Sequence, residues 1–347
     1  MTRTSFITIA VIAICVIFAG NVRAHPPWSI AVDRSGQIYF SDLETIWRID
    51  VQGKLSVLRA GVRGRHTHEL TIDADGNLYG EDLRYEPATQ RFISALWKIT
   101  PAGDFEYILA PTDSPPKGMS IWKDRSGNMY SVAQPGGSRE ALILKRTTDG
   151  KIIALSGDSR AVDEVQPGVL YSDGMALAPD GSLYIRTGVD TRRVTMDGAI
   201  TILPRSPVGF AVDAQGNIFG ADYVDRRIIK RTPDGKETIL LHTPSPWRPA
   251  GVALKDSALY VLELRLPFWG ALDGARVLKR SSDGTVTVLA ALREGKQVPA
   301  HISLADTDNW NAIRSERSTL YLIGAGIIAL TVAVWYLYRV RFKPRKP

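Results

Sequence analysis

The stretch from Gly209 to Leu240 reads GFAVDAQGNIFGADYVDRRIIKRTPDGKETIL. It contains four short apolar segments, separated by polar runs that carry Gly, Asn or Asp. Alternating apolar and polar residues are typical of half-buried β-strands, and Gly or Asn supplies the positive φ that a tight turn requires. The stretch therefore predicts two successive antiparallel hairpins, which together form one four-stranded sheet.

The same pattern occurs six times along the chain. The second hairpin of each copy turns at a glycine, and these glycines lie 37 to 50 residues apart: Gly53, Gly103, Gly150, Gly198, Gly235 and Gly284. Four-stranded units that repeat at this spacing indicate a β-propeller, because one blade cannot bury both of its faces alone. We predict an all-β fold, a six-bladed β-propeller of four-stranded antiparallel blades, over residues 25–290.

The copy at Gly209–Leu240 resembles an NHL repeat, and the other five copies resemble it more loosely. The wider group with this likeness includes the gluconolactonase-like, strictosidine-synthase-like and paraoxonase-like six-bladed propellers. The resemblance covers about three quarters of the chain and implies the fold. It leaves the activity open, because this fold serves both enzymes and binding modules.

Both ends of the chain have the features of membrane-targeting segments. Residues 1–24 combine Arg3, an apolar run and small residues before His25, which predicts a secretory signal peptide; an uncleaved signal anchor is the alternative. Residues 319–338 carry no charge and are long enough to form a transmembrane helix. The basic tail 339–347 then predicts a cytoplasmic C-terminus, with residues 291–318 as a stalk between propeller and membrane.

The net charge of +7 comes from the two ends of the chain. Arg3, Arg23 and the five basic residues of the tail account for it, so the residues between them carry 36 basic and 36 acidic side chains. A neutral propeller does not favour nucleic acid as a partner. The single cysteine, Cys15, lies within the predicted signal, so the mature chain would contain no thiol for a disulfide or a thiolate metal site.

Insertions collect on one end of the predicted propeller, where the innermost strand of each blade begins. In gluconolactonase-like enzymes this ring holds a divalent metal, and the sequence around Asp173-Gly174 resembles that motif, with Glu69 as a second ligand. The resemblance implies Ca²⁺ or another divalent cation, and Glu69 and Asp173 as catalytic candidates. The ring otherwise departs from the pattern, because Lys117 brings a positive charge and no Asn is present. A plain polar channel is the alternative.

Other residues at this end suit binding. His66 and His68 with Glu69 suggest zinc, although three-ligand spacing is absent and a solvated loop is the alternative. Arginine and exposed aromatic residues are typical interface anchors. The binding candidates are His68, Lys117, Arg84, Tyr85, Trp247, Arg248, Phe268 and Trp269.

Two functions of different classes follow. The leading interpretation is a propeller outside the cytoplasm, in a bacterial periplasm or at a cell surface, which is tethered by one helix and binds a ligand or a protein. The alternative is a metal-dependent hydrolase or lactonase that acts through Glu69 and Asp173. No Ser-His-Asp arrangement, phosphate loop or nucleotide motif is present in the sequence.

Overall fold

The computed structural model describes residues 29–299, except 125, 134–141, 157–161, 163–173, 187–189, 196, 205–206 and 266–271. All of these belong to the first of two compact units, Met1–Ala300. The predicted signal peptide, most of the predicted stalk, the transmembrane helix and the tail lie outside the described residues. Within the described part of the chain, no helix is long and apolar enough to span a membrane.

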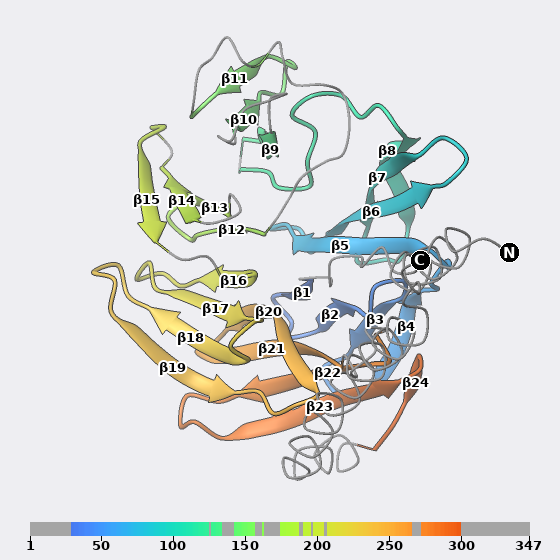
Figure 1. Ribbon diagram of the computed structural model, residues 1–347, viewed down its shortest axis with the longest axis vertical. Helices are drawn as coiled ribbons and strands as arrows, with labels where there is room; N and C mark the ends of the chain where they lie inside the picture. Colours follow the sequence, from blue (N-terminus) through green and yellow to red (C-terminus); the bar gives the residue numbers. More distant parts are fainter. Residues whose placement is uncertain are drawn as a thin grey trace, which may run out of the picture. The chain divides into compact units, whose positions relative to one another are not determined.

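The described residues form six antiparallel sheets, each built from strands consecutive in the sequence (Figure 1). The first sheet comprises β1 (Ile30–Val32), β2 (Ile38–Ser41), β3 (Ile46–Ile49) and β4 (Leu55–Arg59). The second comprises β5 (Arg65–Ile72), β6 (Leu78–Glu86), β7 (Arg91–Ile99) and β8 (Phe105–Thr112). The third comprises β9 (Met129–Ala133), β10 (Leu142–Arg146) and β11 (Ile152–Ala154).

The remaining three sheets complete the propeller. The fourth comprises β12 (Met175–Leu177), β13 (Leu183–Arg186), β14 (Asp190–Val194) and β15 (Ile200–Pro204). The fifth comprises β16 (Gly209–Val212), β17 (Ile218–Asp222), β18 (Arg227–Arg231) and β19 (Glu237–His242). The sixth comprises β20 (Trp247–Lys255), β21 (Ala258–Arg265), β22 (Gly274–Arg280), β23 (Val286–Arg293) and β24 (Lys296–Gln297). This arrangement confirms the predicted six-bladed propeller of antiparallel blades.

Two blades depart from the four-strand prediction. In blade 3 the segment expected to form the innermost strand makes only an isolated bridge between Lys123 and Met129. There the Trp122 amide donates to the Ser120 hydroxyl, a local bond that competes with a sheet ladder. Blade 6 gains β24, so its sheet continues past residue 290 through a turn at Glu294 and Gly295, both with positive φ.

The ring closes by side-chain packing between the last and first blades. One apolar cluster combines Ile30, Phe40 and Trp47 of blade 1 with Leu262 and Val277 of blade 6. Each sheet contains only neighbouring strands of the sequence, so no strand is exchanged between the ends within the described residues. The hydrophobic contact between blade faces therefore takes the place of a strand exchange.

The turns within each blade lie at one end of the propeller, and the first hairpins of blades 1, 2 and 3 share one hydrogen-bond arrangement. In the first hairpin of blade 2, Asp73 accepts hydrogen bonds from the Asn77 amide nitrogen at 2.9 Å and from the Tyr79 hydroxyl at 2.9 Å. Burial alone would raise the pKa of Asp73, but these bonds hold that pKa below its usual value. Blades 1 and 3 carry the same Asp, Gln or Asn, and Tyr arrangement.

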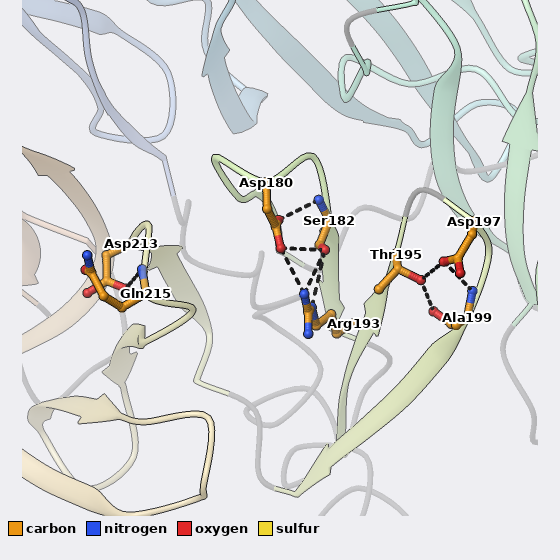
Figure 2. Close-up of polar contacts among 8 residues, drawn as sticks. All are labelled: Asp180, Ser182, Arg193, Thr195, Asp197, Ala199, Asp213 and Gln215. Atoms are coloured by element: carbon orange, nitrogen blue, oxygen red, sulfur yellow. Dashed lines mark hydrogen bonds and ion pairs between the residues drawn. The ribbon is translucent and has the colours of Figure 1, made fainter.

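In blade 4 a different set of hydrogen bonds stabilises the turn of the first hairpin (Figure 2). Ala178 stands where blades 1, 2, 3 and 5 have aspartate, and Asp180 instead accepts from the Ser182 amide at 2.8 Å and from Arg193 at 2.8 Å. In the second hairpin of that blade, the Thr195 hydroxyl bonds the Asp197 carboxylate. We call this end, formed by the turns within hairpins β1–β2 and β3–β4 and their equivalents, the short-turn end.

Candidate functional site

The opposite end, which we call the loop-rich end, carries the connections between hairpins and between blades. Because the short-turn end is fixed by equivalent turns, a longer strand can extend only at the loop-rich end. Blade 1 has strands of three to five residues, whereas β6, β7 and β20 each have nine. Blades 2 and 6 therefore extend beyond blade 1 at this end, on either side of it.

Glu69 lies where the innermost strand of blade 2 enters the propeller. Its side chain is 4% exposed, and it stands opposite Glu81 of β6 in the strand register, so both carboxylates face the same side of the sheet. The register shifts between Thr67 and Glu69, which makes His68 the extra residue of a bulge. The Ser29 hydroxyl donates to the His68 carbonyl, which links blades 1 and 2.

The predicted partners of Glu69 are only partly described. Asp173 lies outside the described residues. The Lys117 ammonium donates to the Val162 carbonyl at 3.0 Å, and the Lys117 carbonyl accepts from Arg146 at 3.2 Å. Lys117 therefore forms part of the junction between blade 3 and the chain that follows it.

The two histidines of β5 form a stacked pair. The His66 and His68 rings lie 6.2 Å apart with 28° between their planes. Burial lowers the pKa of His66, against a smaller opposing effect of Glu44, so the imidazole is held in its neutral form at pH 7. Within the described residues, no group of three or more His, Cys, Asp and Glu side chains is placed to hold a metal ion.

The glycines at the start of the innermost strands have a packing role. A Cβ on Gly209 would lie 2.4 Å from the Ala250 carbonyl oxygen, and one on Gly174 would lie 2.8 Å from that of Val208. The backbones of blades 4, 5 and 6 thus approach too closely for a side chain at these positions. This crowding explains why glycine stands at positions 174 and 209, and no metal is needed to explain it.

The β6–β7 hairpin presents the predicted binding residues Arg84 and Tyr85 at the surface. Tyr85 is 43% exposed, and its ring centroid lies 5.3 Å from that of Phe92, which is also exposed. Arg84 pairs with Glu86 at 3.3 Å. Sequence reasoning missed Phe92, although its position opposite Tyr85 follows once the hairpin register is known.

The other predicted binding residues have different surroundings. Arg248 lies over the Tyr223 ring at 5.1 Å and donates to the Tyr223 carbonyl at 2.9 Å. Trp247 was expected at an exposed surface, but it is fully buried beneath the Arg276 guanidinium, 4.4 Å from the ring centroid. Its apolar surface is therefore used within blade 6. Phe268 and Trp269 lie outside the described residues.

Sequence reasoning also missed a buried polar cluster in each extended blade. In blade 2, Asp82 accepts hydrogen bonds from Thr67 at 2.8 Å, Trp97 at 2.9 Å and Arg59 at 2.7 Å. In blade 6, Glu263 accepts from Thr243 and from Arg276, both at 2.6 Å. The signal in the sequence is an acidic residue three positions after the aromatic residue of the second strand: Asp42, Asp82, Asp222 and Glu263.

Comparisons with known proteins bear on the fold. No family model matches the sequence, and no curated protein matches it. Among solved structures, virginiamycin B lyase from Staphylococcus aureus is 20% identical, with 76% of this chain and 83% of that chain covered and a TM-score of 0.44. A gluconolactonase from Xanthomonas campestris is 15% identical, with 68% and 83% covered and a TM-score of 0.46.

A third similar structure is a luciferin-regenerating enzyme, 17% identical, with 67% of this chain and 82% of that chain covered and a TM-score of 0.42. All three are similar to this chain over most of their length. At these identities and TM-scores the likeness carries no conclusion about function.

Proposed function

We propose that this chain is a binding module outside the cytoplasm, a six-bladed propeller that is tethered by one C-terminal helix and engages a ligand or protein through its loop-rich end. The observation that carries the proposal is the difference between the two ends. Equivalent tight turns fix one end, whereas the strands of blades 2 and 6 extend beyond blade 1 at the other. Binding residues are commonly placed on variable segments held by a rigid scaffold.

The chemistry of the extended β6–β7 hairpin supports binding. Tyr85 and Phe92 expose aromatic rings side by side, and Arg84 and Arg91, next to them in the sequence, belong to the other face of the same two strands. Aromatic and arginine side chains are enriched among the residues that contribute most to interface affinity. Burying two such rings at an interface removes a large apolar area from water, which outweighs the loss of their rotamer freedom.

The location rests on the ends of the sequence. The signal-like residues 1–24, the uncharged run 319–338 and the basic tail 339–347 agree on one orientation, with the propeller outside and the tail inside. A reporter enzyme that is active only after export, fused after Pro347, should be inactive. An active reporter would contradict the cytoplasmic position of the tail.

Site-specific crosslinking in intact membranes tests the binding proposal. A photoreactive phenylalanine analogue replaces Tyr85 in the full chain, within cells that naturally produce it, and the matched control replaces Val51 of a short turn, which is 56% exposed. We expect a discrete crosslinked product at Tyr85 and none at Val51. Equal products at both positions, or none at Tyr85, would contradict binding at the loop-rich end.

One observation favours the alternative of a metal-dependent hydrolase or lactonase. Glu69 and Glu81 are buried carboxylates that face the same side of β5–β6 near the start of the innermost strand. Carboxylate oxygens are the ligands that a hard divalent cation such as Ca²⁺ prefers. In that case Glu69 and Asp173 would be ligands of the cation.

Metal analysis of the purified full-length protein separates the two functions. Stoichiometric calcium or another divalent metal that is lost in both Glu69→Gln and Asp173→Ala, together with lost lactone turnover, would favour the enzyme. Metal content and turnover that do not respond to either substitution would exclude these residues as the site. Asp256→Asn, at an exposed turn, is the matched control.

A further inference from the structure

A groove lies between the outer strands of blades 1 and 2. It has a volume of about 280 Å³, and its walls include Leu58 and Arg59 of β4 together with Arg65, Ile99, Phe105 and Tyr107 of blade 2. β4 and β8 are the outermost strands of their sheets, so the groove is on the rim of the propeller. Glu69 is not among the residues that line it.

The apolar wall of the groove is formed by aromatic rings set at an angle. Phe105 is 43% exposed and Tyr107 is 41% exposed, and their ring centroids lie 5.0 Å apart with 86° between the planes. Phe105 also lies against Trp97 at 6.1 Å. Perpendicular rings form a notch that suits a branched aliphatic side chain. A flat sugar or base would instead need an open ring face on which to stack.

The charged side chains that line the groove are two arginines, Arg59 and Arg65. Arg59 is neutralised by Asp82 at 2.7 Å, and its guanidinium lies over the Trp97 ring at 4.4 Å. Arg65 stands opposite Arg84 in the β5–β6 register, and within the described residues no carboxylate forms an ion pair with Arg65. None of the side chains that line the groove is acidic.

Arg65 favours an anionic ligand. Its neighbour across the β5–β6 register, Arg84, pairs with Glu86 at 3.3 Å, whereas Arg65 lines a groove that has no acidic side chain in its walls. Arginine also presents two parallel N–H donors that match the geometry of a carboxylate. The electrostatic complement of this groove is therefore an acidic group next to an apolar one.

The edge of β8 supplies a third kind of contact. Within the described residues, β8 pairs only with β7, so one row of its backbone N–H and C=O groups is available to another chain. An extended peptide can pair with such an edge and place alternate side chains into neighbouring pockets. Phe105 and Tyr107 are two residues apart on β8, which is the repeat of an extended strand.

We propose that this groove binds an extended acidic peptide segment of a partner protein. An aliphatic side chain of the peptide enters the notch between Phe105 and Tyr107, and a carboxylate pairs with Arg65. The inference goes beyond the proposed function because it concerns the rim between two blades, and it holds or fails independently of contacts at Tyr85.

Fluorescence anisotropy with defined peptides tests this proposal on the full-length protein in detergent micelles. The probe is a fluorescein-labelled peptide of four Leu-Asp repeats, and the comparison peptides are four Leu-Lys repeats and four Ser-Asp repeats. We expect the Leu-Asp peptide to bind at least tenfold more tightly than either comparison peptide. No binding of the Leu-Asp peptide, or equal affinity for the Leu-Lys peptide, would overturn the proposal.

Three variants locate the binding site. Arg65→Glu and Tyr107→Ser should each weaken binding of the Leu-Asp peptide at least tenfold. Arg63→Glu, the same charge reversal in the loop next to the groove, should change it less than threefold. Equal losses in Arg65→Glu and Arg63→Glu would show that only general charge attraction is present, and would overturn the assignment to this groove.

Two further readouts keep the result interpretable. Thermal unfolding followed by circular dichroism should give midpoints within a few degrees for all three variants, because the substituted side chains are partly exposed. A labelled oligogalacturonate of similar length and charge is titrated in parallel. Tighter binding of this sugar than of the Leu-Asp peptide would assign the groove to acidic glycans and would overturn the peptide assignment.

Discussion

Removing the Asp82 carboxylate should destabilise the propeller more than removing any exposed charge. Asp82 is 3% exposed and accepts hydrogen bonds from Thr67, Trp97 and Arg59. In Asp82→Ala, two neutral donors and one guanidinium lose their acceptor within the blade. Breaking a buried ion pair by removing one partner costs about 3–5 kcal/mol, and each buried neutral donor adds about 1–3 kcal/mol where water cannot reach it.

The Arg59 side chain is 16% exposed, so water reduces part of this cost. These costs sum to about 5 kcal/mol at their lower limits, and with this reduction we expect a loss of about 4 kcal/mol. For a domain of this size 1 kcal/mol corresponds to about 2–4 °C, which places the midpoint of thermal unfolding about 8–16 °C below that of the unmodified protein. The measurement is circular dichroism at fixed protein and detergent concentrations.

The equivalent position in blade 5 provides the matched control. Asp222 pairs with Arg227 at 2.9 Å, but both side chains are about one fifth exposed, and Arg227 also pairs with Asp225 and Glu237. Asp222→Ala should cost about 1 kcal/mol. Equal midpoints for Asp82→Ala and Asp222→Ala would refute the reasoning, because burial and the number of donors would then have no effect on the cost.

Three further changes test the fold. Gly209→Ala places a Cβ against the Ala250 carbonyl oxygen and should cost about 3 kcal/mol, measured as a lower unfolding midpoint. Ser257→Gly should stabilise the protein by about 0.5–1 kcal/mol, seen as a higher unfolding midpoint. Asp256 and Ser257 both have positive φ in a two-residue hairpin, a conformation in which Gly is unstrained. Raising the pH from 10 to 12 should destabilise the propeller. Burial, together with the nearby Asp73, raises the pKa of Tyr79 in the folded protein to about 12, above the ordinary tyrosine value of 10.0. The stability that this neutral phenol contributes below pH 10 is therefore lost as the phenol ionises.

Each of these predictions has a contradicting result. A Gly209→Ala midpoint within 1 °C of the unmodified protein would show that blades 5 and 6 are further apart. Ser257→Val should lower the midpoint, and stabilisation by both Val and Gly would exclude backbone strain as the cause. Absorbance at 295 nm follows tyrosine ionisation, and ionisation of every tyrosine by pH 10 would contradict the raised pKa of Tyr79.

Much of the fold could be predicted because its decisive features are local. Each turn glycine from Gly53 to Gly284 has positive φ, and this requirement is readable from four or five consecutive residues. The departures depend on longer-range effects. The innermost strand of blade 3 is replaced by a bridge at Lys123, and β24 pairs with β23 through a turn that follows the last repeat. Periodicity within a repeat contains no signal for either.

The candidate site was less predictable because its contacts join different repeats. Arg84 and Tyr85 were predicted in an inserted loop, whereas the structure extends strands β6 and β7 through most of that insertion. Arg59 and Asp82 belong to successive blades, so their ion pair depends on how the blades pack. Trp247 is covered by Arg276 of the same blade, which lies 29 positions later in the sequence and two strands away in the sheet, so this contact is not local in the sequence either. An aromatic residue in a predicted loop was therefore a poor indicator of an exposed one.

The polar clusters and the extended strands have a common physical cause. Extending a blade at the loop-rich end adds side chains between neighbouring blades, and their polar groups then need partners there. Among the described residues, the acidic side chains of a second strand that are almost fully buried, such as Asp82 and Glu263, lie in the two blades with nine-residue strands. Asp222, in a blade with shorter strands, stays partly exposed. The buried clusters thus stabilise the extensions on which the proposed binding surface depends, and losing one should weaken binding along with stability.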